Sequence, residues 1–248
     1  MAKLTKAEAK MHAEAEELLR QPGQLGQLGH DEKVFIFEHW QESANHVNSA
    51  AGAFFTPYEY AMDVALEVGG GRVLDLCAGI GTLSYACSLR RDDVDITCVE
   101  LNPAYVELGK RIVPDAEWVC ANIFDLPDLG KFDYVISNPP FGNIKGVGDT
   151  PRYKGKEFQY KVIDLAADLG GHGVFILPAN SAPFVYSGAP YYDWRPNQKY
   201  NTFTKQTGIE LDLGIGIDST VYPEFHGAPV STEVCVTDFD GVERGLFE

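Results

Sequence analysis

Residues 138–141 read Asn-Pro-Pro-Phe and end an apolar run that begins at Val135. The Asn138 amide and the Pro139 carbonyl can accept hydrogen bonds, and Phe141 offers an aromatic face. Pro139 and Pro140 restrict the turn and remove two backbone donors, so the nearby acceptors stay aimed. A strand end does not need this combination for folding. We therefore interpret the segment as a catalytic site; the alternative for Phe141 is an ordinary packing role.

A glycine-rich turn follows an earlier apolar run and offers a second place for chemistry. Asp75 stands at the end of that run, and Cys77 and Ala78 follow it within the turn. Gly79 and Gly81 let the chain turn tightly and approach a ligand closely. The spacing is not the complete G-x-G-x-x-G of a dinucleotide site, because Cys77 stands where a first glycine is expected. A generic strand-to-helix turn is the alternative interpretation.

Two further strand ends carry residues that suit a nucleoside. Glu100, followed by Leu101, ends the next apolar run, where an acid can bind two ribose hydroxyls. Asn122 ends the third run, where its amide can read an adenine edge while Ile123 packs on the ring face. Each residue alone could be a cap. Their succession at three consecutive strand ends predicts a nucleoside-containing cofactor.

The elements that position these residues alternate in type. Strands are expected at 72–78, 95–101, 116–123, 131–138 and 171–180, with helices at 57–68, 81–91, 103–113 and 156–171. This alternation predicts an α/β fold with a mostly parallel, Rossmann-like sheet that is covered on both faces. Two final strands, 209–217 and 230–239, are expected to pair antiparallel. In such sheets ligands bind beyond the carboxyl ends of the strands.

The remaining chain divides into a helical start and a later loop. Helices are expected at 5–21 and 31–47, joined by a Gly-rich connection. We expect residues 1–50 to form an N-terminal helical extension and residues 51–248 to form the catalytic domain. The aromatic and Pro-rich stretch 181–203 is expected to be a functional loop or lid, or equally a packed loop.

Composition limits the function classes. The net charge of −16 argues against loose, sequence-independent nucleic-acid binding. One local basic stretch, which contains Lys145, Arg152 and Lys154, is either a substrate contact or a solvated face. No apolar run approaches the ~18–20 residues of a membrane span, and the start lacks an apolar signal core. Five scattered cysteines without zinc spacing favour reduced thiols in a cytoplasmic protein and no metal site.

On these motifs the chain resembles class I S-adenosylmethionine-dependent methyltransferases. "NPPFG" at 138–142 is similar to the hallmark of amino-group DNA methyltransferases. "GAFFTPYEYA" at 52–61 resembles a motif of adenine-N6 enzymes of the gamma order, and the modification subunits of type I restriction systems share both stretches. "VYPEFHGAPVSTEVCV" at 221–236 also resembles their sequence before the last strand. The resemblance covers about residues 51–237.

The resemblance implies a methyl transfer from S-adenosylmethionine to the N6 amine of adenine in DNA. The implied donor site contains Phe55, Thr56, Asp75, Cys77, Ala78, Gly79, Gly81, Glu100, Leu101, Asn122, Ile123 and Asn138. In the implied mechanism the Asn138 oxygen and the Pro139 carbonyl accept the amine hydrogens, and the flipped base stacks on Phe141. Tyr222 and Phe225 are expected to form the opposite wall of the base pocket, with Lys145, Arg152 and Lys154 contacting the nucleic acid.

The sequence departs from the family and leaves alternatives open. Asn122 stands where many relatives have Asp, and no target-recognition domain is visible after the last strand, so a separate specificity subunit or a homo-oligomer is considered. Asn-Pro-Pro also occurs in methyltransferases that act on RNA adenine or protein glutamine. Cytosine N4 could occupy the same geometry. A non-catalytic module that binds the donor or a partner is the remaining alternative.

Overall fold

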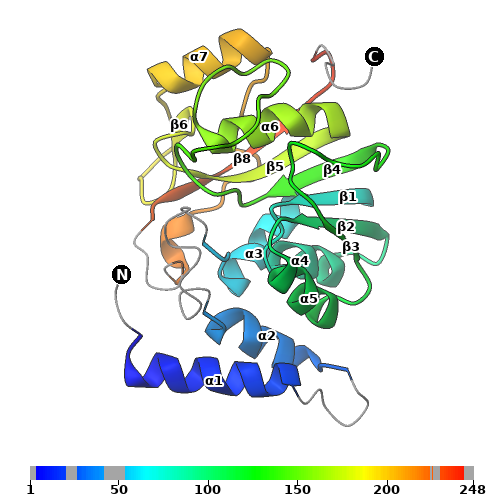
Figure 1. Ribbon diagram of the computed structural model, residues 1–248. Coiled ribbons are helices and arrows are strands. Elements are labelled where there is room, and N and C mark those ends of the chain that lie inside the picture. Colours follow the sequence, from blue (N-terminus) through cyan, green and yellow to red (C-terminus); the bar gives the residue numbers. More distant parts are fainter. Residues whose placement is uncertain (1–3, 21–26, 42–53, 224, 226–229, 243–248) are drawn as a thin grey trace.

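The computed structural model describes residues 4–20, 27–41, 54–223, 225 and 230–242, and its centre is a six-stranded sheet (Figure 1). The strand order is β3-β2-β1-β4-β5-β8. The strands are β1 (Gly71–Leu76), β2 (Val94–Glu100), β3 (Glu117–Cys120), β4 (Phe132–Ser137), β5 (Gly170–Pro178) and β8 (Thr232–Asp238). The first five run parallel, and β8 pairs antiparallel with β5. The predicted Rossmann-like class and its antiparallel last strand are confirmed.

Helices cover both faces of this sheet, as expected for parallel strands (Figure 1). One face packs against α3 (Tyr58–Val64), the 3-10 turn η2 (Ala65–Glu67), α4 (Thr82–Arg90) and α5 (Pro103–Ile112). The other face packs against α6 (Phe158–Leu169), and α7 (Gln198–Thr207) lies beyond it. α5 begins where the sequence indicates, because Pro103 occupies its first turn and the Asn102 side chain accepts from the Ala104 N–H.

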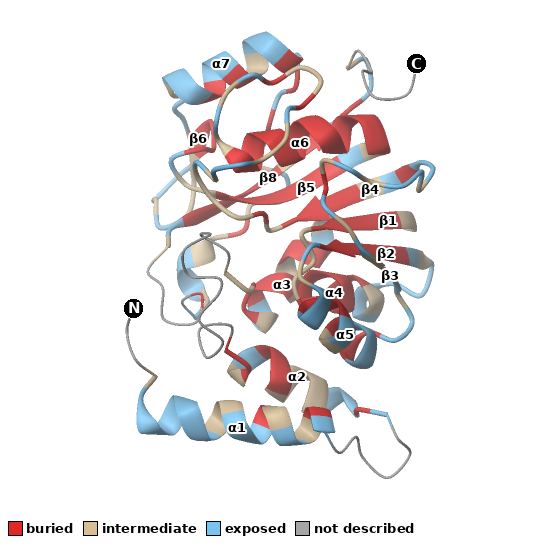
Figure 2. Cartoon of the chain, viewed as in Figure 1, coloured by how far each residue is buried: buried red, intermediate tan, exposed pale blue. Residues whose placement is uncertain are grey.

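The helix α6 is buried along its whole length. All twelve residues of α6 are buried, including Asp164 and Asp168 (Figure 2). The helix therefore lies between the sheet and the α7 region, where Tyr160 stacks on Phe203 with ring centroids 4.6 Å apart. A second cluster fills the opposite face from Tyr60 and Ala61 of α3 to Val174 of β5. These two clusters pack against opposite faces of the sheet and stabilise it.

Two sequence expectations in the C-terminal third are wrong. Residues 209–217 do not form a strand; only Asp212 pairs with β8, at Val236. Gly214 and Gly216 have φ values of 67° and 79°, so the backbone cannot stay extended there. The stretch expected to be a loop contains the short antiparallel pair β6 (Phe184–Val185) and β7 (Asp193–Trp194), and then α7.

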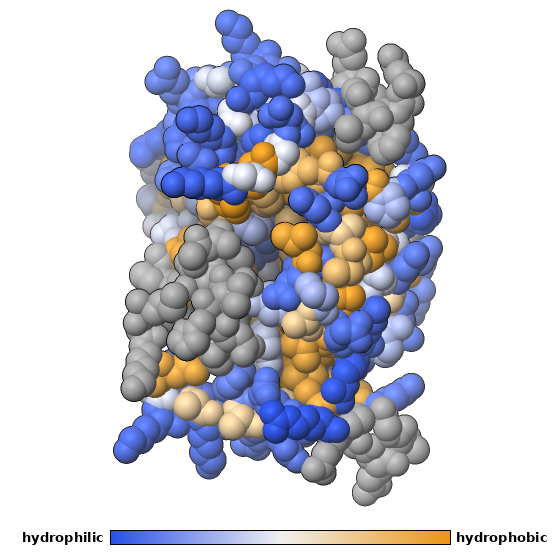
Figure 3. Space-filling model, in the orientation of Figure 1, coloured by the Kyte–Doolittle hydropathy of each residue, from blue (hydrophilic) through white to orange (hydrophobic). Residues whose placement is uncertain are grey.

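The N-terminal helices α1 (Lys6–Arg20) and α2 (His30–His39) share one hydrophobic cluster with residues of α4 and α5. The boundary expected at residue 50 and most of the Gly-rich connection lie outside the described residues. Figure 3 shows hydrophobic surface running down the middle of the face turned to the viewer, with a mostly hydrophilic α1 at its foot. In the described part of the chain, no helix combines the length and the apolar character needed to cross a membrane.

Candidate functional site

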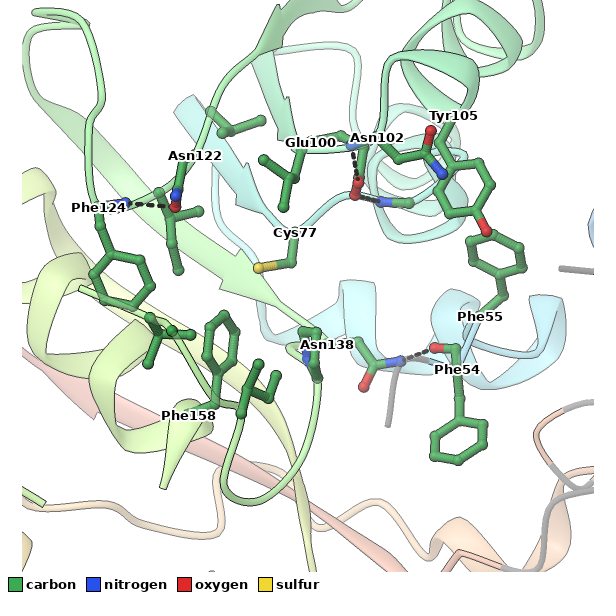
Figure 4. Close-up of a pocket in the computed structure, with 18 of the residues that line it drawn as sticks. Phe54, Phe55, Cys77, Glu100, Asn102, Tyr105, Asn122, Phe124, Asn138 and Phe158 are labelled. Atoms are coloured by element: carbon green, nitrogen blue, oxygen red, sulfur yellow. Dashed lines mark hydrogen bonds between the residues drawn. The ribbon is translucent and has the colours of Figure 1, made fainter. Parts of the chain in front are cut away.

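A cavity of about 330 Å³ opens at the carboxyl ends of the parallel strands (Figure 4). Its lining comes from the ends of β1, β2, β3 and β4, from residues 54–55, from the loop after β4 and from the start of α6. The sheet therefore brings the three predicted strand ends together around one space. Gly79 after β1, Glu100 of β2 and Asn122 after β3 all line it, and Asn138 after β4 joins them.

Cys77 and Gly79 of the glycine-rich turn line this cavity, and Ala78 lines a smaller adjoining pocket. The predicted site residue Gly81 lines neither and faces Trp118 and Val113. Gly79 and Gly81 have φ values of 59° and 92°, and Cys77 also has a positive φ, 62°. Position 77, where the sequence lacks the expected glycine, is thus held in a conformation that glycine adopts more easily. A Cβ at Gly79 would lie 2.8 Å from the Phe55 ring, so only a glycine lets this ring approach.

Glu100 joins this turn to the second strand. Its carboxylate accepts hydrogen bonds from the N–H of Gly79 at 2.9 Å and from the N–H of Asn102 at 2.8 Å. Burial raises its pKa, and the backbone donors oppose that rise. The two N–H bonds fix the carboxylate at the cavity wall, as Figure 4 shows.

Asp75 lies beneath the turn and is almost completely buried. Its Oδ2 accepts a 2.7 Å hydrogen bond from Ser84, whereas its buried Oδ1 has no partner among the described residues. Burial raises the pKa of Asp75 to about 7. A small adjoining pocket is lined by Asp75, Thr56 and Asn138.

The third strand end supplies an apolar wall. Ile123 is buried and lines the cavity with Phe124, while Asn122 forms a turn in which its Oδ1 accepts from the Phe124 N–H at 3.2 Å. Phe158 of α6 faces Phe124 edge-on, with centroids 5.9 Å apart. This end can enclose a flat apolar ring.

Asn138 follows β4 and is held in one orientation. Its Nδ2 donates to the Phe54 carbonyl at 2.9 Å and to the Thr56 hydroxyl at 3.0 Å. Because a carbonyl oxygen can only accept, the amide must turn its nitrogen toward residues 54–56. The Oδ1 therefore faces away from that anchor, as Figure 4 shows. Such a fixed acceptor can bind an N–H of a substrate.

An aromatic cluster flanks this amide. Phe54 lies between Phe141 and Phe225, with centroid distances of 6.4 and 6.5 Å. Tyr60 contacts Phe225 edge-on and stacks on Tyr222 at 4.9 Å. The structure thus brings Tyr222 and Phe225 to the same wall as Phe141, although they lie more than 80 residues away in the chain. Residues 224 and 226–229 of this stretch lie outside the described residues.

The three basic residues expected to contact substrate have different surroundings. Lys145 is exposed and lines the cavity. Arg152 is inside the fold: its guanidinium pairs with Asp164 at 2.6 Å and with Asp168 at 2.9 Å, and both carboxylates are buried. The Lys154 ammonium donates to the Thr150 and Pro151 carbonyls. The geometry therefore assigns Arg152 to stabilising α6 rather than to a substrate surface.

Sequence reasoning missed part of the lining. The additional cavity residues are Val99, Asn102, Tyr105, Phe124, Ile144, Gly146, Val147 and Phe158. Phe124 and Asn102 lie two residues after the predicted strand ends Asn122 and Glu100, so the sequence could have indicated that they line the cavity. Phe158 and Val147 had no local signal, because only the tertiary fold brings α6 and the loop after β4 to this edge.

Comparisons with known proteins agree with this architecture. Residues 61–150 match the family model "Methyltransferase small domain". The ribosomal protein uL3 glutamine methyltransferase of Francisella tularensis is 28% identical over 108 residues, which is 41% of this chain and 33% of the relative. The ribosomal RNA small subunit methyltransferase C of Shewanella sp. strain MR-4 is 30% identical over 114 residues, or 44% of this chain and 31% of the relative. The chain thus matches about a third of the length of these curated relatives.

A structural comparison with the N-terminal domain of EvdMO1, solved with S-adenosylhomocysteine bound, gives a TM-score of 0.49 and 14% identity. That alignment covers 93% of this chain and 96% of the other. Residues 61–150 thus resemble a methyltransferase domain, and the mostly parallel sheet has the predicted Rossmann-like arrangement. The finer resemblance to DNA adenine enzymes is not among the matches described.

Proposed function

We propose that this protein is an S-adenosylmethionine-dependent methyltransferase that modifies the planar amino nitrogen of a nucleic-acid base, with adenine N6 in RNA as the main substrate. The observation that carries this proposal is the fixed amide of Asn138, whose nitrogen is anchored on Phe54 and Thr56. The Asn138 oxygen and the Pro139 carbonyl together can accept both hydrogens of an amine, whereas a hydroxyl or a thiol offers only one, and the aromatic cluster beside them suits a flat ring.

The cavity fits the donor in three parts. We assign the apolar end at Ile123, Phe124 and Phe158 to the adenine ring of S-adenosylmethionine. Glu100, fixed by two N–H bonds, lies at the wall where the ribose hydroxyls can bind. Asp75, with one unpartnered buried oxygen, can compensate the positively charged methionine end. Leu101 lines the mouth of the cavity and is exposed.

The residues of the chain then organise the transfer. When bound, S-adenosylmethionine supplies an activated methyl group on a positively charged sulfur. The Asn138 Oδ1 and the Pro139 carbonyl each accept one hydrogen of the substrate amine, which holds its lone pair toward the donor. These acceptors also stabilise the positive charge that develops on the nitrogen. After transfer, the nitrogen releases a proton to solvent, so the chain needs no general base.

The relatives favour RNA or protein over DNA as the substrate. The two curated relatives described above carry the names of a ribosomal RNA methyltransferase and a ribosomal protein glutamine methyltransferase. The aromatic cluster of Phe54, Phe141, Phe225 and Tyr222 favours a base over a glutamine side chain, because a base can stack between rings. We therefore place RNA adenine first and protein glutamine second.

DNA adenine remains a candidate for a specific reason. Residues 54–56 belong to the stretch that resembles DNA adenine methyltransferases, and they hold the catalytic amide directly. Against this, Arg152 is engaged with two buried carboxylates and is not available to bind phosphate. A DNA-acting enzyme of this charge would depend on the remaining local bases or on a specificity partner.

One labelling experiment separates the three substrates. Purified protein is incubated with S-adenosylmethionine that carries a labelled methyl group and, separately, with unmodified ribosomal RNA, DNA and ribosomal proteins. Nucleoside and amino-acid analysis of each digest identifies the product. We expect N6-methyladenosine in RNA, lost in Asn138→Ala. Label found only in glutamine or only in DNA would contradict the main proposal and select the corresponding alternative.

A further inference from the structure

The N-terminal helices end in a tryptophan that is almost completely buried. Trp40 follows α2 directly and is 2% exposed. Its indole Nε1 donates to Glu16 of α1 at 3.3 Å, and the His12 ring lies 5.9 Å away, centroid to centroid. The His12 Nδ1 also accepts from the next backbone N–H, that of Gln41, at 3.0 Å. Two polar side chains of α1 therefore fix where this tryptophan points.

Trp40 contacts two rings that line the donor cavity. Its centroid lies 5.6 Å from that of Phe55 and 5.7 Å from that of Tyr105, the latter edge-on at 89°. Phe55 and Tyr105 also contact each other, at 5.2 Å, and Figure 4 shows them together at one end of the cavity. On its other side, Phe55 lies directly against Gly79 of the glycine-rich turn.

Residues 54–56 therefore receive contacts from three directions. Trp40 packs on Phe55, Asn138 donates to both Phe54 and Thr56, and Phe141 packs on the Phe54 ring. A shift of this short segment would move the cavity wall and the anchor of the catalytic amide together. Its position depends on packing, because none of the described regular elements contains it.

We propose that Trp40 is a positioning residue of the methyltransferase site, through which the N-terminal helices hold residues 54–56. The inference rests on the proposed donor and amide roles of that segment. It makes the extension part of the catalytic machinery rather than an independent domain. Trp40 acts through Phe55 and Tyr105 and does not itself line the cavity described above.

Three variants test the role of Trp40 by changing different aromatic contacts of the N-terminal helices. Trp40→Ala removes the ring that supports Phe55 and Tyr105, whereas Trp40→Phe keeps an aromatic contact. Phe37→Ala is the matched control, because Phe37 is completely buried in α2 but packs on Tyr58 and Tyr85, toward α3 and α4. Both alanine variants lose stability, so each is studied at a temperature where it is folded.

Calorimetric binding of S-adenosylhomocysteine is the primary measurement, since it needs no knowledge of the substrate. We expect about tenfold weaker binding for Trp40→Ala, because the donor wall loses two aromatic contacts. Trp40→Phe should recover most of the affinity, and Phe37→Ala should bind as the wild type does. With the substrate found by labelling, kcat of Trp40→Ala should fall as well, because the anchor of Asn138 shifts.

The outcomes separate this inference from the proposed function. Wild-type affinity in folded Trp40→Ala would overturn the positioning role while leaving the donor site intact. Equal losses in Trp40→Ala and Phe37→Ala would also overturn it, because helix docking in general would then be responsible. A wild-type protein that failed to bind S-adenosylhomocysteine would instead contradict the donor site itself.

Discussion

The proposed donor half of the site, at Asp75, Glu100 and Asn122, and the proposed acceptor half, at Asn138 and the aromatic cluster around Phe54, are built in different ways. The donor half consists of successive strand ends, and Asp75, Glu100 and Asn122 follow one another in the chain as they do around the cavity. The acceptor half combines segments that are far apart: the Asn138 amide donates at 2.9 Å to the carbonyl of Phe54, which lies 84 residues away in the chain. The carboxyl ends of parallel strands lie at one edge of the sheet, so the fold itself brings the donor residues together. The position of the acceptor residues depends instead on how separate loops pack.

This difference predicts how each half responds to change. The donor half has polar groups fixed by backbone N–H donors, so its substitutions should alter donor affinity. The acceptor half has one fixed amide and an aromatic wall, so its substitutions should alter rate or substrate capture. The two halves meet at residues 54–56, which anchor Asn138 and contribute Phe54 and Phe55 to the cavity.

The largest expected effect belongs to the acceptor half. Asn138→Ala should lower the methylation rate by about 10²–10³, because the bond to the amine strengthens as charge develops. Donor affinity, measured by calorimetry, should change little. Thr56→Ser serves as the control, since it keeps a hydroxyl for the Asn138 amide. An Asn138→Ala enzyme with wild-type turnover would remove this residue from the mechanism.

The second effect belongs to the donor half. Glu100→Ala should weaken S-adenosylmethionine binding about 10- to 100-fold, because a buried, charged acceptor for the ribose is lost. Glu117→Ala removes an exposed carboxylate at the start of β3 and should bind the donor normally. Calorimetry measures the donor affinity of both variants. Equal affinity for the two would show that Glu100 only braces the glycine-rich turn.

The donor half was also the part that sequence could predict. Asp75, Gly79, Glu100 and Ile123 all line the cavity or its adjoining pocket, because strand ends in a parallel sheet share one edge. Their assignment to individual parts of the donor remains a prediction. The glycine expected at position 77 is absent, yet Cys77 adopts the positive φ of that position.

The C-terminal third was harder to predict for physical reasons. α7 has usable signals, since Asn197 caps its first turn and Gly208 ends it. The many aromatic and proline residues before this helix favoured the prediction of a loop instead. Arg152 looked like a surface base, because nothing in the local sequence shows that Asp164 and Asp168 turn inward. The contact of Trp40 with Phe55 likewise depends on the tertiary fold alone.

A smaller effect is expected from the aromatic wall. Phe141→Ala should raise the substrate KM about tenfold, because stacking of a base contributes ~1–3 kcal/mol. Phe141→Tyr should keep the wild-type KM, since either ring can stack. Steady-state kinetics with the accepted RNA measure both variants. If Phe141→Ala kept the wild-type KM, the substrate would not stack on this ring, and protein glutamine would become the better candidate.

The smallest expected effect is a pH dependence that returns to the donor half. Burial raises the pKa of Asp75 to about 7, far above its ordinary value. Below that pH the folded protein therefore holds a proton that the unfolded chain would release, so the unfolding free energy falls as pH rises from about 4 to about 7. Asp75→Asn should remove this fall, and denaturant unfolding at pH 5 and pH 8 measures it.

Donor binding should show the opposite trend, because the ionised carboxylate attracts the positively charged donor. Between pH 6 and pH 8 the ionised share of Asp75 rises from roughly a tenth to nine tenths, so donor affinity should increase severalfold. Asp75→Asn should bind weakly at both pH values and show no such rise in calorimetry. A wild-type affinity that stayed constant across this range, with the stability trend present, would place Asp75 in the fold alone. The charge of the donor half would then have to come from Glu100, whose two N–H bonds already hold it at the cavity wall.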